Sequence, residues 1–183
     1  MIVLPLLFFN NISMTNPTPD YDAEAMYAAL LQQIKAGLAH AENVALVGIH
    51  SGGAWLAERL AADLQLEERL GFIDISFHRD DYAEKGLKSD VKTTQIPFEV
   101  NGATVVLVDD VLYTGRTTRA AINELFDYGR PARVLLAALA DRGGRELPVA
   151  ADFLGATISL PDQRLLVLQQ ADDGRFSLTV DHV

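Results

Sequence analysis

The sequence contains no cysteine among its 183 residues. Disulfides, thiolate metal sites and thiol nucleophiles are therefore excluded, and a reducing compartment such as the cytoplasm is the expected location. Positive charge is also scarce, because 15 Lys and Arg residues face 25 Asp and Glu residues and leave a net charge of -10. A chain whose main task is to coat nucleic acid or an anionic membrane normally has the opposite balance.

Long hydrophobic runs are also missing. The apolar stretch at residues 1–9 lacks the basic n-region of a signal peptide and is too short to span a bilayer. A secretory signal is one interpretation of this stretch; we favour a start at Met14, with residues 1–13 as an upstream extension. We accordingly expect a flexible extension over residues 1–19 and a single domain over residues 20–183.

The spacing of apolar residues predicts alternating helices and strands. A helix is expected from residue 20 onward, with Met26, Leu30, Ile34 and Leu38 on its apolar face and capping residues at 18–20. Two more helices are expected at about 54–66 and 117–128. Strands are expected at 43–49, 72–77, 103–108 and 133–139, with shorter ones at 165–169 and 176–180. We therefore predict an α/β fold with a mainly parallel central sheet flanked by helices.

Residues 105–117 read VVLVDDVLYTGRT and carry the strongest chemical signal in the chain. We expect a buried strand that stops at the adjacent carboxylates Asp109 and Asp110, followed by a short turn and a helix. Gly115 permits close approach of a ligand to the backbone, and free N–H groups at a helix start form a phosphate site. Hydroxyl and cationic side chains surround this turn: Thr114, Arg116, Thr117 and Thr118.

Two carboxylates beside a phosphate site indicate a ligand that also presents hydroxyls or a divalent metal, because carboxylates interact favourably with both. A sugar phosphate with a vicinal diol has both parts. The structural alternative is that Asp109 caps the turn, Asp110 is solvated and Thr117 is an ordinary N-cap. Ligands of parallel sheets collect at the carboxyl ends of the strands, where the glycine turn at residues 51–53 is also expected.

A cationic segment interrupts the acidic chain. Residues 79–92 contain four basic and four acidic residues and show no clean period. We expect a long flexible loop that covers the site, excludes water and neutralises a small polyanion. The alternative is a solvated surface loop. The basic residues are Arg79, Lys85, Lys88 and Lys92.

Residues 105–117 resemble the signature of type I phosphoribosyltransferases, which bind 5-phosphoribosyl 1-pyrophosphate (PRPP). The resemblance narrows to the PyrR family and extends from about residue 20 to the C-terminus. It is carried by FIDIS at 72–76, RDD at 79–81, DDVLYTGRT at 109–117, GRP at 129–131 and DRGGRELP at 141–148. Members of that family are uracil phosphoribosyltransferases, and some also bind pyr-operon messenger RNA and attenuate transcription.

The resemblance implies a role for each matching residue. Asp109, Asp110 and Arg79 would be catalytic, with the two carboxylates on the ribose hydroxyls and the loop after Arg79 closing as a hood. Asp141 and Arg142 would form the uracil end. PRPP or the product UMP would be bound by Ser51, Gly52, Gly53, Asp109, Asp110, Val111, Leu112, Tyr113, Thr114, Gly115, Arg116, Thr117 and Thr118.

Magnesium would be carried by the PRPP oxygens, so the resemblance implies no cluster of metal-ligating side chains. The four histidines also lack metal-binding spacing, and we interpret them as structural or exposed residues. They are His40, His50, His78 and His182.

Several positions depart from the family pattern. Many members have Thr-Arg-Gly in the pyrophosphate loop, where this chain has residues 51–53. RNA-binding members carry several arginines on the first helix, whereas Lys35 is the single basic residue of positions 20–43. A usual His-Arg pair is here Gly144-Arg145, and Ala156 stands at the position of a lysine. Because phosphate contacts dominate RNA affinity, we expect binding to pyr leader RNA to be weakened.

We therefore expect a cytoplasmic uracil phosphoribosyltransferase of pyrimidine salvage, a glycosyltransferase that makes UMP and pyrophosphate from uracil and PRPP with Mg²⁺. The resemblance suggests a homodimer or a larger homo-oligomer and no membrane partner. Two alternatives stay open. One is an RNA-binding attenuator of the pyr operon with weak transferase activity, and the other is a phosphoribosyltransferase for another base, such as a purine.

Overall fold

The computed structural model describes residues 21–75, 93–160 and 164–182. Its centre is a five-stranded sheet with the strand order β2-β1-β3-β4-β5, in which every neighbouring pair is parallel. The strands are β1 (Val44–Ile49), β2 (Leu70–Ile73), β3 (Thr104–Leu112), β4 (Arg133–Asp141) and β5 (Phe153–Thr157). The predicted α/β class with a parallel central sheet is therefore confirmed.

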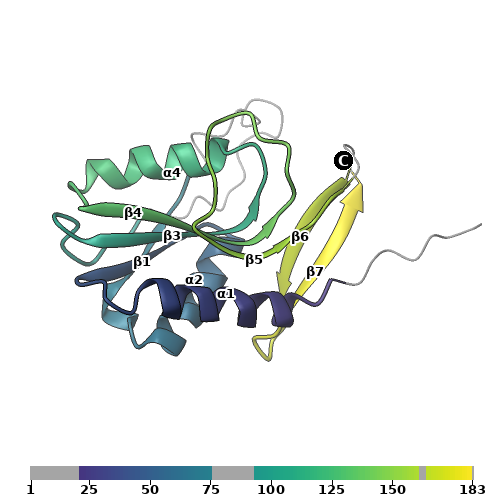
Figure 1. Cartoon of the computed structure of the whole chain (residues 1–183), viewed down its shortest axis with the longest axis horizontal. Helices are drawn as coiled ribbons and strands as arrows, with labels where there is room; N and C mark the ends of the chain where they lie inside the picture. Colours follow the sequence, from purple (N-terminus) through teal and green to yellow (C-terminus); the bar gives the residue numbers. More distant parts are fainter. Residues whose placement is uncertain (1–20, 76–92, 161–163, 183) are drawn as a thin grey trace, which may run out of the picture.

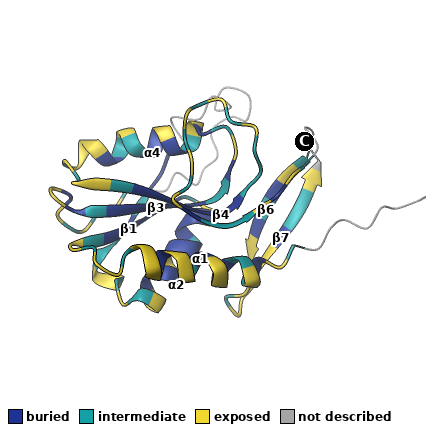
Figure 2. Cartoon of the chain, in the orientation of Figure 1, coloured by how far each residue is buried: buried dark blue, intermediate teal, exposed yellow. Residues whose placement is uncertain are grey.

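Helices cover both faces of this sheet, with α1 and α2 on one side and α4 on the other (Figure 1). Their bounds are α1 (Ala23–Gly37), α2 (Gly52–Leu64) and α4 (Arg116–Asp127), and a short 3₁₀ helix, η1 (Glu67–Arg69), precedes β2. Alternate residues of β3 enter two cores: Val106 and Val108 pack with α1 and α2, whereas Val105 and Leu107 pack with α4. Burial is therefore concentrated along the central strands (Figure 2).

Strand β3 is longer than its sequence indicates. The expectation that it stops at the acidic pair is wrong, because β3 runs through Asp109 and Asp110 to Leu112. The neighbouring β4 supplies the pairing that extends it: Asp109 aligns with Ala138, and Leu112 aligns with Asp141. Consecutive strand residues point to opposite sides, so the two carboxylates leave the backbone in different directions.

The first helix has a different apolar face from the expected one. Its buried residues are Ala23, Tyr27, Leu30 and Ile34, whereas Met26 and Leu38 are only partly buried. A helix has 3.6 residues per turn, so a strict spacing of four drifts off the face. Asp22 caps the helix by accepting a hydrogen bond from the backbone N–H of Ala25 at 2.9 Å.

A glutamine forms hydrogen bonds to the backbone of each edge strand, Gln33 through its side chain at β5 and Gln95 through its main chain at β2. The sequence did not predict the edge strand β5. There, Gln33 of α1 donates to the Leu154 carbonyl at 2.6 Å and accepts from the Leu154 N–H at 3.1 Å. At the other edge, the backbone of Gln95 exchanges two hydrogen bonds with that of Phe72, at 2.7 and 2.8 Å.

A separate antiparallel hairpin, β6 (Arg164–Gln170) with β7 (Phe176–His182), stands at one end of the molecule (Figure 1). Both strands were expected, and each extends a residue or two beyond the prediction. No helix in the described part of the chain is long and apolar enough to cross a membrane.

An ionic and aromatic cluster fastens this hairpin to α1 and α2. Arg59 forms a two-bonded ion pair with Glu24, both bonds at 2.8 Å, and Glu24 also accepts from the Phe176 N–H at 2.7 Å. The Arg59 hydrogen bond is the main reason that the pKa of Glu24 is lowered. Tyr27 donates to Asp63 at 2.7 Å, and its pKa is raised first by burial and then by this bond.

Candidate active site

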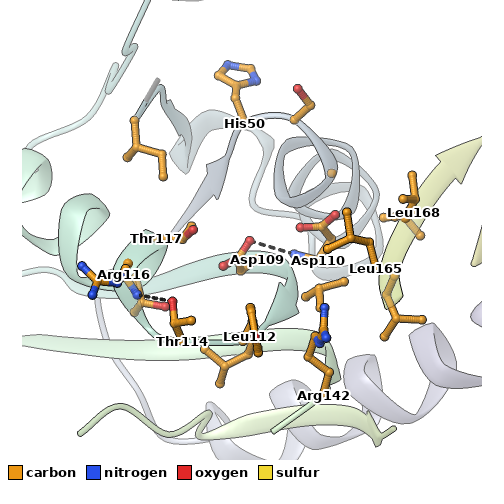
Figure 3. A pocket seen from close by; sticks show the side chains of 18 of the residues that line it. His50, Asp109, Asp110, Leu112, Thr114, Arg116, Thr117, Arg142, Leu165 and Leu168 are labelled. Carbon is orange, nitrogen blue, oxygen red and sulfur yellow. Dashed lines mark hydrogen bonds between the residues drawn. The ribbon is translucent and has the colours of Figure 1, made fainter. Parts of the chain in front are cut away.

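A large cavity among the described residues lies at the carboxyl ends of the central strands. It has a volume of about 840 Å³ and lies between the starts of α2 and α4 and strand β6 (Figure 3). Fourteen of its lining positions had been singled out in the sequence, although His50 was read as structural. They are His50, Ser51, Gly52, residues 109–118 and Arg142. Gly53 and Asp141 are not among the described residues that line it.

The acidic pair lies at the centre of this cavity. Asp109 is 4% exposed and Asp110 is half-buried. The backbone N–H of Asp110 donates to Asp109 Oδ1 at 3.0 Å, which orients the more buried carboxylate (Figure 3). A buried carboxylate needs such bonds to offset its loss of water. The arrangement therefore offers one fixed carboxylate and one more accessible carboxylate.

The glycine turn rests directly on β3. A Cβ atom at position 52 would lie 2.6 Å from Cγ of Asp110, and a Cβ at position 53 would lie 3.0 Å from Cα of Asp109. At position 53 the backbone carbonyl oxygen of Val108 lies closer still, so a side chain there would collide with β3; at position 52 the obstacle is the Asp110 side chain, which can shift. The peptide bond between His50 and Ser51 is cis, and no side chain caps the start of α2.

The start of α4 opens onto the same cavity. Gly115, with a φ of 90°, occupies the N-cap position without a side-chain bond, so the alternative in which Thr117 is the N-cap is wrong. Thr114 Oγ1 accepts from the Arg116 N–H at 3.3 Å. Thr118 is 1% exposed, and its Oγ1 has no hydrogen-bond partner among the described residues. The first turn therefore presents hydroxyl and N–H donors.

The segment after β4 is bonded to the segment after β3. Arg145 forms an ion pair with Asp141 and donates to the carbonyls of Tyr113, Leu112 and Val149, the last two at 3.3 and 2.9 Å. Asp141 also accepts from the Gly143 N–H at 2.8 Å. The Asp141 carboxylate is thus used inside the loop, whereas the neighbouring Arg142 lines the cavity.

Arg116 joins the same two segments from the solvent side. Its guanidinium lies 2.7 Å from a carboxylate oxygen of Glu146, and both side chains are more than half exposed. The backbone N–H groups of Glu146 and Leu147 also donate to the Thr114 carbonyl, at 3.0 and 3.1 Å. The predicted phosphate turn and the predicted uracil end therefore form one hydrogen-bonded unit.

Three further sequence predictions concern the cationic loop, the histidines and a metal. Arg79 and the cationic loop over residues 79–92 lie outside the described residues. His50 lines the cavity and stacks on Phe72, with the ring centroids 5.5 Å apart. The described residues contain no group of three or more His, Cys, Asp or Glu side chains that could hold a metal ion.

Comparison with known proteins places this geometry in a family. The phosphoribosyl transferase domain family matches residues 21–163. A protein of Ralstonia nicotianae named bifunctional protein PyrR is 53% identical over 163 residues, which cover 86% of this chain and 93% of the relative. A protein of the same name from Nitrosococcus oceani is 43% identical over 170 residues, covering 90% and 96%. The chain belongs to the PyrR family.

Solved structures agree on the fold of this PyrR-family chain. A hypoxanthine phosphoribosyl transferase of Trypanosoma cruzi gives a TM-score of 0.63 at 20% identity and covers 90% of each chain. A hypoxanthine-guanine phosphoribosyltransferase of Bacillus anthracis gives 0.63 at 19% identity, with 90% of this chain and 96% of that chain covered. At such identities the likeness concerns the type I phosphoribosyltransferase fold alone.

Sequence reasoning missed one wall of the cavity in this PyrR-family chain. Residues 165–168 of β6, together with Trp55 and Ile75, line it. The available signal was the apolar run LLVL at 165–168: Leu166 and Leu168 are buried in the core with α1 and α2, whereas Leu165 is 39% exposed. No motif indicated that this hairpin would fold back over α2, where contacts between residues distant in the chain hold it, both in the core and at Glu24.

Proposed function

We propose that the protein transfers the 5-phosphoribosyl group of PRPP to uracil and forms UMP and pyrophosphate. The bond between C1 of the ribose and the pyrophosphate oxygen breaks, a bond forms between C1 and a ring nitrogen of uracil, and that nitrogen loses its proton. The observation that carries the proposal is the meeting of three features in one cavity. These are the acidic pair of β3, the donor-rich start of α4 and the glycine turn, which lines the cavity through Ser51 and Gly52.

Each feature suits one part of PRPP. The first turn of α4, with the unpartnered Oγ1 of Thr118, suits the 5′-phosphate. Asp109 and Asp110 suit the ribose hydroxyls as acceptors. Ser51 and Gly52 at the open start of α2 suit the pyrophosphate, because a glycine turn lets phosphate oxygens approach backbone N–H groups.

The remaining side of the cavity suits a planar base. Residues 165–168 of β6 supply apolar surface, and Arg142 supplies hydrogen-bond donors. Uracil presents two carbonyl acceptors and flat apolar faces, so both kinds of surface have a counterpart. The PyrR relationship supports uracil over a purine, which remains the alternative substrate class.

The protein residues act by position and charge. An oxocarbenium-like transition state needs anchored ribose, a neutralised leaving group and exclusion of water. The carboxylates Asp109 and Asp110 orient the ribose, and we assign neutralisation of the pyrophosphate to Arg79 and the loop after it. When bound on PRPP, Mg²⁺ neutralises phosphate charge. The donor set fits a metal carried by the substrate, because Asp109 and Asp110 line the cavity and carboxylate oxygens are ligands that Mg²⁺ prefers.

A pyrophosphate-release assay tests the proposal. The full chain is given PRPP, Mg²⁺ and, in separate reactions, uracil, cytosine, hypoxanthine, guanine or no base. We expect release with uracil and formation of UMP, with at most slow release in the other reactions. Release with a purine and none with uracil would assign another base, and the absence of release with every base would refute the enzyme.

A regulatory role is the second candidate, favoured by the bifunctional relatives. We propose that any binding of pyr leader RNA is weak. Lys35 is the one basic residue of α1, which also carries Glu24 and is capped by Asp22. Arg145 is 23% exposed and its guanidinium bonds to the Asp141 carboxylate and to backbone carbonyls, so it offers little charge to phosphate.

Filter binding to a pyr leader RNA at two salt concentrations tests this second role. Few phosphate contacts predict weak binding and a shallow dependence on salt. Submicromolar binding with a steep dependence would show that an RNA-binding surface exists. A homo-oligomeric state and a cytoplasmic location complete the proposal; the absence of cysteine fits the latter.

A further inference from the structure

Tyr113 and Arg142 form a stack at the mouth of the cavity. The guanidinium carbon of Arg142 lies 4.0 Å from the centre of the Tyr113 ring, and both residues line the cavity. Tyr113 follows the end of β3, whereas Arg142 follows the end of β4. A cation that close to an aromatic face is held by electrostatic attraction and by dispersion.

The Arg142 guanidinium has a donor that is not used among the described residues. Its Nε is buried and has no hydrogen-bond partner among the described residues. This separates it from the other arginines of the unit, since Arg145 pairs with Asp141 and Arg116 pairs with Glu146. A buried donor without an acceptor is costly. Because the Arg142 side chain also lines the cavity, its guanidinium can donate to a ligand that brings a carbonyl oxygen.

The backbone of the unit fixes the two partners of the stack. Arg145 donates to the carbonyl of Tyr113, and the N–H of Arg142 donates to the carbonyl of Leu112 at 3.1 Å. Gly144 has a φ of 72°, and a Cβ atom there would lie 2.9 Å from Cδ2 of the Tyr113 ring. Glycine at this position therefore leaves the space in which the ring lies against the guanidinium.

We propose that Tyr113 is a positioning residue for base recognition: its ring holds the Arg142 guanidinium in the orientation that meets a carbonyl oxygen of the pyrimidine. Tyr113 thereby acts on the base through Arg142, in addition to the place of its backbone in the phosphate turn. The ring, and not the hydroxyl, performs this role. This inference rests on the proposed function, because it assigns part of the specificity of the same site.

Substitutions at position 113 separate ring from hydroxyl. Steady-state kinetics of Tyr113→Phe and Tyr113→Leu are compared with the wild type, with KM measured separately for uracil and for PRPP. We expect Tyr113→Phe to stay within about twofold of wild type, because the ring face is kept. Tyr113→Leu is expected to raise the KM for uracil by about five- to tenfold while the KM for PRPP changes by less than about twofold.

A double-mutant cycle with Arg142→Gln supplies the second measurement. If Tyr113 acts through Arg142, Tyr113→Leu has little further effect on the KM for uracil once Arg142 is replaced. Tyr128→Leu is the matched control, because Tyr128 is an exposed tyrosine at the end of α4, and it should change neither KM. Thermal unfolding of each variant identifies any that fails to fold. Should Tyr113→Leu be lost in this way, Gly144→Ala, which displaces the ring, is expected to raise the KM for uracil in its place.

Three results would overturn the inference: equal kinetics for the Phe and Leu variants, an equal rise in both KM values, or full additivity in the cycle. Each presupposes that the wild type uses uracil. Failure of the wild type to use uracil would instead refute the proposed function, so the two failures are distinguishable.

Discussion

The contact between the glycine turn and the acidic pair allows a test that leaves every charge in place. In Gly52→Ala, the new Cβ atom would lie 2.6 Å from Cγ and 2.8 Å from Cβ of Asp110, where ordinary contact begins at 3.4 Å. Asp110 Oδ2 would lie closer still, so the carboxylate or the turn must move by roughly 0.6–1.0 Å to restore normal packing. The obstacle is a side chain that borders open space in the cavity, so we expect the carboxylate to take most of the shift.

The expected loss concerns activity more than stability. A misplacement of about 1 Å in a reacting site can cost on the order of a hundredfold in rate, so kcat/KM for PRPP should fall by about ten- to a hundredfold. Unfolding free energy should fall by about 1 kcal/mol, the lower end of the overpacking range, because a side chain can yield. Pyrophosphate release under varied PRPP gives the first quantity, and urea unfolding gives the second.

Gly102→Ala is the matched control for this test. Gly102 precedes β3, has a φ of 71° and has no atom within 4 Å of an added Cβ. Its replacement should cost about 1 kcal/mol of stability through the left-handed backbone alone and leave kcat/KM unchanged. A folded Gly52→Ala variant with the wild-type kcat/KM for PRPP would refute the reasoning, because the position of Asp110 would then be irrelevant to turnover.

Two further predictions concern the carboxylates and the hairpin anchor. The double variant Asp109→Asn with Asp110→Asn should abolish turnover with little loss of folding, since charge is removed at nearly constant shape; a wild-type kcat/KM for PRPP in that variant would contradict the site. The pKa of Tyr27 is raised above its ordinary value of 10.0, first by burial and then by the hydrogen bond to Asp63. The contribution of Tyr27 to folding stability is therefore complete below pH 10 and is lost as the pH rises through the raised pKa. Tyr27→Phe should therefore be less stable than wild type by about 1 kcal/mol at pH 8, and urea unfolding should show the gap narrowing above pH 10; a constant gap would contradict this assignment.

The sequence was most informative where one strand is buried on both faces. Residues 103–108 predicted β3 and, through it, the parallel sheet. The end of that strand was not predictable, because Asp109 and Asp110 look like a loop until β4 pairs with them. Strand β5 was also not predictable from local sequence, because Gly155 weakens the strand pattern. Glycine is needed there for the close packing of α1, since an added Cβ would lie 2.8 Å from the Met26 carbonyl oxygen.

In the site too, features carried by one local segment were predictable, whereas features set by contacts between distant segments were not. Residues 109–118 are contiguous, so one segment of sequence predicted half of the lining. The apolar wall of β6 comes from a hairpin distant in the chain, and no local pattern places it over the cavity. The orientation of Asp141 was also hidden, since the turn at Gly143 and Gly144, both with φ above 70°, brings Arg145 back onto it.

The two glutamines at the sheet edges constrain how copies of this chain can associate. Gln33 bonds to both backbone groups of Leu154 on β5, and Gln95 bonds to both backbone groups of Phe72 on β2. An exposed strand edge is a template for β-strand addition and for aggregation. At these two positions the template is already filled from within the chain. A second copy that added a strand at either position would therefore first have to displace these internal hydrogen bonds.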